Sequence, residues 1–128
     1  MYTMEERNQF KNELKVRLCG WSVRLIKYLR SLSRNTKELF LSSIMDQLVR
    51  SGTSVAANYI EAIGSPSFQD FRKFISYSLK SANESVYWLT LIQNTDIDHS
   101  DEVVWLLKES REIASILGKS VSTMYKNV

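Results

Sequence analysis

Four polar side chains, spaced three or four residues apart, form the arrangement in this sequence with the most chemical potential. Such a spacing places all four on one side of a helix. A guanidinium and a carboxylate on one stripe could bind a ligand or a nucleic acid. We favour the alternative, a polar network buried inside the protein, because charges removed from water need partners. The stripe consists of Arg50, Ser54, Asn58 and Glu61, and its expected partners on another helix are Lys80 and Glu84.

Residues that could carry catalysis or hold a metal are sparse. The only histidine, His99, falls in a polar segment, and no Glu-x-x-His pair is present to hold iron as in metal-binding helical bundles. Serines and threonines are plentiful, but no histidine is placed to activate one, and no glycine-rich phosphate loop occurs. The single cysteine, Cys19, has no metal-ligand spacing around it. We therefore expect no enzyme, no metal and no cofactor.

Positive charge is concentrated at the start of the chain. Residues 1–35 hold eight Lys or Arg against three Glu, whereas residues 96–128 hold four basic residues against six acidic ones. Several of the basic side chains share the side of a helix opposite its apolar stripe. This basic face could contact phosphates, it could be solvated, or it could meet the acidic last helix of a neighbouring subunit. Its residues are Arg17, Arg24, Lys27, Arg30 and Arg34.

A second apolar strip runs beside the core stripe of the third predicted helix. A helix in a monomeric bundle needs only one apolar face. Tyr and Trp are enriched where subunits meet, so the strip predicts an oligomer interface. The alternative is an unusually wide buried face within one subunit. The strip consists of Phe74, Tyr77, Trp88 and Leu91.

Long helices must position these side chains. The chain has 128 residues, 44% of them apolar, with only four Gly and one Pro, which suits a single helical domain over residues 1–128. Apolar residues repeat at spacings of three and four residues in four segments, each of which predicts a helix. The segments are Glu5–Leu32, the stretch from a cap at Asn35 to Gly64, the stretch from a cap at Ser67 to Ile92, and Val103–Tyr125. Gly64 suits a left-handed helix end. The mid-helix Gly52 predicts close approach of a neighbouring helix, with a local kink as the alternative. Short connections then predict an all-α, up-down-up-down antiparallel four-helix bundle.

No targeting or membrane signal is visible. The chain contains no run of about 18 apolar residues, and its first residues lack the apolar stretch of a signal peptide. We therefore expect a cytoplasmic protein without a membrane partner.

Two segments carry a family resemblance. The segment from Arg50 to Ala62 resembles the signature of the four-helix-bundle protein family whose founding members are encoded in intervening sequences of 23S ribosomal RNA genes, and Lys80–Leu89 resembles its second motif. The resemblance covers roughly residues 10–125. It implies a ring-shaped homo-oligomer, commonly a pentamer, without established catalytic activity. The fold also resembles the accessory protein of diversity-generating retroelements, which binds nucleic acid and a reverse transcriptase, so a role with RNA or DNA follows by analogy.

Two functional hypotheses result. The leading one is a non-enzymatic, self-assembling bundle that serves as a scaffold or accessory protein and binds RNA or DNA through the basic face. The alternative is a protein–protein interaction module without affinity for nucleic acid. Salt-dependent binding separates them, because phosphate contacts weaken steeply as salt rises.

Overall fold

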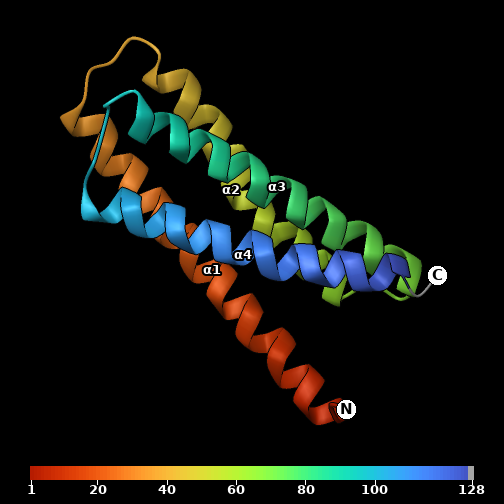
Figure 1. Ribbon diagram of the computed structural model, residues 1–128. Coiled ribbons are helices and arrows are strands. Elements are labelled where there is room, and N and C mark those ends of the chain that lie inside the picture. The colour runs from red at the N-terminus through yellow and green to blue at the C-terminus, as the bar shows by residue number, and fades with distance from the viewer. Residues whose placement is uncertain (127–128) are drawn as a thin grey trace.

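Four helices make up the protein in a computed structural model that describes residues 1–126 (Figure 1). The chain reverses direction at each short connection, and each helix contacts the next one along the chain (Figure 1). Because α4 also contacts α1, the four helices close into an antiparallel up-down-up-down bundle, and the predicted fold is confirmed. The helices are α1 (Met4–Asn35), α2 (Leu41–Ile63), α3 (Phe68–Asn94) and α4 (Asp101–Lys126).

The predicted apolar stripes form the core. Trp21 of α1, Leu48 of α2, Leu89 of α3 and Leu106 of α4 are each at most 1% exposed. The Trp21 indole N–H donates to the backbone oxygen of Leu106 at 3.0 Å, so the one polar atom of this large side chain is satisfied. The stripes therefore meet along the bundle axis and hold the outer faces in fixed positions.

Side-chain caps explain where several helices begin. At α1 the Thr3 hydroxyl accepts from the Glu6 N–H at 3.1 Å, and the Glu6 carboxylate accepts from the Thr3 N–H at 2.7 Å. The predicted Ser67 cap of α3 is confirmed, since its hydroxyl accepts from the Asp70 N–H at 3.1 Å. Both caps satisfy amide groups that the first helical turn leaves free.

Two predicted helix ends are wrong. Asn35 donates to the backbone oxygen of Ser31 at 3.0 Å, so it continues α1, and α2 begins only at Leu41 without a side-chain cap. Gly64 has a φ of −92° and is not left-handed. The left-handed residue is Asp96, with a φ of 59°, where the Ile97 N–H donates back to the Ile92 oxygen and closes the end of α3.

Close packing of α1 on α2 depends on Gly52. A methyl group at this position would overlap the Leu25 side chain and lie 3.4 Å from Trp21. The predicted close approach is confirmed, and it explains why glycine occupies the middle of a helix despite its low helix propensity.

The outer ends of two predicted stripes are not buried. Phe10 and Phe68, which fall within the predicted apolar repeats of the first and third helices, are 55% and 58% exposed. The reason for Phe10 is length: α1 has 32 residues and α2 only 23, so the start of α1 continues past the end of its neighbour.

Candidate functional site

The polar stripe of α2 lies on the surface of the bundle. Arg50 and Glu61 are exposed, whereas Ser54 and Asn58 are half-buried. The Ser54 hydroxyl donates to the Arg50 backbone oxygen at 2.6 Å, and the Asn58 amide donates to the Ser54 backbone oxygen at 2.9 Å. These bonds stay within α2, so the stripe does not link helices.

The predicted buried network is therefore wrong within one subunit. Lys80 and Glu84 of α3 are also exposed, and over residues 1–126 neither of them forms an ion pair with Arg50 or Glu61. The polar stripe lies at the edge of the apolar stripe of α2 and not beneath it. The long side chains of Arg50 and Glu61 therefore reach water. Solvation is the less costly state, since burying an ion carries a penalty of several kcal/mol.

Serines make the buried polar contacts between α2 and α3. The Ser51 and Ser85 hydroxyl oxygens are 3.0 Å apart, and Ser78 donates to the backbone oxygen of Val55 at 2.7 Å. Each of these serines is at most 4% exposed. Ser78 follows Ile75 by three residues and Ser85 precedes Leu89 by four, so their burial was visible in the periodicity, but Ser51 was missed. The signal for Ser51 was its spacing, three residues after Leu48 and four before Val55, which places it on the apolar side of the helix.

The apolar strip of α3 is divided between its own core and the surface. Phe74 and Trp88 are partly buried and pack against the core, and Leu91 is half-buried. Tyr77 is 48% exposed, and its ring meets that of Phe74 edge-on at 6.0 Å between centroids. The strip thus serves the fold in part and still presents aromatic surface, and its role as an oligomer interface stays a prediction.

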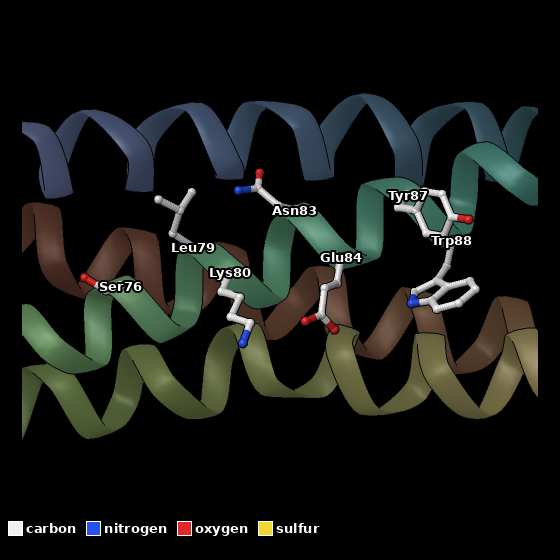
Figure 2. Close-up of a pocket in the computed structure, with 7 residues that line it drawn as sticks. All are labelled: Ser76, Leu79, Lys80, Asn83, Glu84, Tyr87 and Trp88. Atoms are coloured by element: carbon white, nitrogen blue, oxygen red, sulfur yellow. The ribbon is translucent and has the colours of Figure 1, made fainter.

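A shallow depression lies on the outer side of α3 between α2 and α4 (Figure 2). In Figure 2 the side chains of Lys80, Glu84 and Trp88 extend toward α2, whereas Leu79 and Asn83 lie on the α4 side. Every lining residue comes from α3, so the depression has no opposing wall. Such a surface suits a protruding side chain of another protein better than a small molecule, which needs an enclosing cleft.

The basic face of α1 is largely paired within the subunit. The Arg17 guanidinium donates to both carboxylate oxygens of Glu109 at 2.7 Å and also contacts Glu112. The Arg24 guanidinium donates to both oxygens of Glu102 at 3.0 and 2.8 Å. The prediction considered an acidic helix of a neighbouring subunit, but the partner is α4 of the same chain.

These ion pairs shift the protonation equilibria. The hydrogen bond from Arg17 holds the pKa of Glu109 below its ordinary value despite partial burial, and the same bond raises the pKa of Arg17. Two of the five predicted phosphate-binding cations are thus neutralised. Those that remain exposed, with no ion pair among residues 1–126, are Lys27, Arg30 and Arg34.

One further polar contact fixes the end of the bundle. The Tyr28 hydroxyl of α1 donates to Asp98, in the connection between α3 and α4, at 2.7 Å. Burial alone would raise the pKa of Asp98, but hydrogen bonds from Ser100 and Tyr28 outweigh it, and the pKa lies below its ordinary value. Burial and the same bond raise the pKa of Tyr28.

Residues 1–126 offer little for other kinds of site. These residues contain no group of three or more His, Cys, Asp or Glu side chains able to hold a metal ion. None of the four helices is long and apolar enough to cross a membrane. His99 is exposed, and its imidazole contacts the Asp96 carboxylate at 2.8 Å.

Comparison with known proteins places the chain in a family. The model of the 23S rRNA-intervening sequence protein family matches residues 15–119. This chain belongs to that family. A solved structure from the S23 ribosomal protein family of Bacteroides thetaiotaomicron, a protein of unknown function, is 30% identical with a TM-score of 0.78. The match covers 88% of this chain and 97% of the other.

These matches show the fold and the family of the chain, but they do not show an activity. No curated protein sequence matches the chain significantly. The descriptions of the family and of the solved structure name no catalytic activity. The two segments that resemble family motifs in the sequence, Arg50–Ala62 and Lys80–Leu89, lie on α2 and α3, the helices that carry the polar stripe and the depression. The relation to the accessory protein of diversity-generating retroelements stays a prediction.

Proposed function

We propose that this protein is a non-catalytic scaffold whose subunits assemble through the outer side of α2 and α3. We call this surface the α2–α3 face and define it by Arg50, Glu61, Tyr77, Lys80, Glu84 and Trp88. The resemblance suggests five subunits. Assembly would supply the partners that these exposed charges lack among residues 1–126 of one chain.

The observation that carries the proposal is the mixture of exposed aromatic and charged groups on α3. Tyr77 and Tyr87 are 48% and 55% exposed, and the Tyr87 ring meets Trp88 at 4.9 Å between centroids. Lys80 and Glu84, one turn apart on α3, extend toward α2 on the same side as Trp88 (Figure 2). Aromatic anchors within a rim of charges are typical of protein–protein interfaces.

Light scattering of the purified protein at micromolar concentration tests the proposal. We expect a mass several times that of one 14.9 kDa chain. Trp88→Ala should lower this mass, whereas the matched control Trp105→Ala, which removes a half-buried tryptophan from α4, should not. The mass of a single chain for the unmodified protein would exclude the proposal.

Nucleic-acid binding is a second candidate function, carried by the exposed cations Lys27, Arg30 and Arg34. They lie in the C-terminal half of α1 without ion-pair partners among the described residues. Unpaired Lys and Arg can neutralise phosphates and release counterions, which makes binding steeply dependent on salt. If no RNA or DNA binds even at low salt, the protein is an interaction module for proteins alone.

A further inference from the structure

Gly20, in the middle of α1, has no packing role within its own chain. Glycine at such a position costs about 1 kcal/mol of helix stability relative to alanine. A methyl group at Gly20 would meet nothing within 4 Å among residues 1–126, so no neighbouring helix of the bundle requires its absence. Gly52 differs, because a methyl group there would overlap the Leu25 side chain. Glycine permits close approach of another backbone, and at Gly20 that backbone must come from outside the chain.

Exposed apolar side chains lie on both sides of Gly20 along the helix. Val16 and Val23 are 71% and 53% exposed. They are four residues before and three residues after Gly20, which places them on the same side of α1, one turn away in each direction. Arg17 and Arg24 border this side, but their charges are paired with carboxylates of α4. The middle of this side of α1 therefore presents apolar surface.

Opposite charges lie at equal distances from Gly20. Glu13 precedes it by seven residues and Lys27 follows it by seven, so each is within about 20° of Gly20 around the helix. Both are exposed, and neither forms an ion pair among residues 1–126. The Glu13 carboxylate accepts from the Gln9 amide at 3.1 Å, a neutral partner that leaves its charge uncompensated. We define the α1 outer face by Glu13, Val16, Gly20, Val23 and Lys27.

The same division of charge continues toward the two ends of α1. Glu6 and Arg34 lie 14 residues before and after Gly20, within about 40° of it around the helix. Arg7 and Lys11 also belong to the first part of α1, but they lie about 140° and 180° away around the helix. No acidic residue of α1 follows Glu13. The α1 outer face is thus acidic toward its start and basic toward its end.

We propose that the α1 outer face packs against the same face of a second copy of this chain, with the two α1 helices antiparallel and crossing at Gly20. Glu13 of each copy then meets Lys27 of the other. A parallel pair would place Glu13 against Glu13 and Lys27 against Lys27, and like charges in contact oppose association. The antiparallel contact is two-fold symmetric, so each ion pair occurs twice.

This contact goes beyond the proposed function, because it uses a different surface. Both α1 and α3 contact α2 and α4, so α1 lies diagonally across the bundle from α3. One chain can therefore use the α1 outer face and the α2–α3 face at the same time, and the two-fold contact would join two assemblies. Because it engages Lys27 and Arg34, it is an alternative to phosphate binding by these cations.

Charge exchange tests the proposal in nuclease-treated protein. Lys27→Glu and Glu13→Lys each bring like charges together twice, so each should raise the dissociation constant of the pair by at least about tenfold in light scattering. The double variant restores opposite charges and should pair as the unmodified protein does. The matched control is Lys15→Glu, an exposed cation about 140° around the helix from Gly20, which should change nothing. Single variants that pair normally, or a double variant that stays dissociated, would overturn the inference.

A single cysteine provides an independent test of the two-fold axis. In a Cys19→Ser background, Gly20→Cys should form a covalent dimer on oxidation, because the crossing places Gly20 against its own copy. Helices packed about 8 Å apart bring facing Cα atoms within the roughly 7 Å that a disulfide requires. Lys15→Cys in the same background should give only single chains. Pairing that disappears on nuclease treatment would identify nucleic acid as the bridge and would also overturn the inference.

The Trp88→Ala variant separates this contact from the proposed function. It weakens the α2–α3 face but leaves the α1 outer face intact, so the expected mass is that of two chains. Single chains in this variant, with an assembled unmodified protein, would refute the α1 contact and leave the proposed function standing. An unmodified protein with the mass of one chain would refute both.

Discussion

The guanidinium carbon of Arg24 lies over the Trp105 indole ring, 3.4 Å from its centroid, while the guanidinium donates to Glu102 one turn earlier on α4. The tryptophan face and the carboxylate together hold one cation between two helices. With the Arg17 pair, this contact closes the α1–α4 side of the bundle from outside. Two of the five cations that looked available for phosphates in the sequence, Arg17 and Arg24, are therefore used to hold the fold.

Arg17→Gln should destabilise the protein by about 1 kcal/mol. The partner Glu109 has a side chain only 15% exposed, so it would lose its compensating charge in a poorly solvated position, and partial solvent screening limits the cost. Urea unfolding measures the change. The matched control Arg30→Gln, an exposed cation on the same helix without an ion pair among the described residues, should leave the unfolding free energy unaltered. Equal losses in both variants would contradict this assignment.

Gly52→Ala should lower the free energy of unfolding by about 1 kcal/mol. Alanine improves helix propensity by about 1 kcal/mol, but the added methyl group overlaps Leu25, and overpacking costs about 1–3 kcal/mol. The control is Gly20→Ala, where nothing lies within 4 Å of the added methyl group, so we expect stabilisation of about 1 kcal/mol. Opposite signs in thermal unfolding support the close approach of α1 and α2, and stabilisation by both variants would refute it.

Stability should decrease below about pH 4, in part through Asp98. Its pKa is lower in the folded protein than in the unfolded chain, so its contribution is complete above the unfolded pKa of about 4 and is lost as pH falls through the folded pKa. Asp98→Asn should flatten the decline in melting temperature between pH 5 and pH 2. Asp46→Asn, which removes an exposed carboxylate of α2, should leave the curve parallel to that of the parent. Parallel curves for all three proteins would count against the role of Asp98.

Replacing Lys27, Arg30 and Arg34 together with Gln should weaken any binding of RNA or DNA for all sequences alike. The slope of log affinity against log salt should decrease by about one for each lost phosphate contact. Folding should persist because all three side chains are exposed. The double variant Arg17→Gln, Arg24→Gln is the comparison, since those cations are already paired and should affect the slope less. A larger effect from the double variant would instead support nucleic-acid binding through the whole basic face predicted from the sequence.

The helices and the core could be predicted because periodicity depends on sequence spacing alone. The stripe through Leu48, Val55 and Tyr59 is buried as expected, since an apolar row at three and four leaves a helix one side to bury. The cap at Ser67 could be predicted for the same reason, because it depends only on residues close to it in the sequence. The end of α1 could not be predicted in this way. Whether Asn35 ends one helix or begins the next depends on which backbone oxygen accepts a hydrogen bond from its side-chain amide.

The polar contacts could not be predicted to the same extent. Spacing placed Arg50 and Glu61 on one side of α2 but did not fix how far that side is turned from α3, and a rotation of a few tens of degrees separates burial from exposure. Arg17 and Glu109 are 92 residues apart in sequence, so no local pattern joins them. Only the bundle geometry shows that α1 and α4 bring them together.

The serine-lined contact between α2 and α3 has a consequence for the order of folding. These two helices are the most extensively packed pair, and only four residues join them, so their contacts require little loop closure. We infer that this helical hairpin forms the folding nucleus and that α1 and α4 condense on it. Ser78→Ala, which removes the bond to Val55, should then slow refolding, whereas Leu29→Ala in α1 should mainly accelerate unfolding.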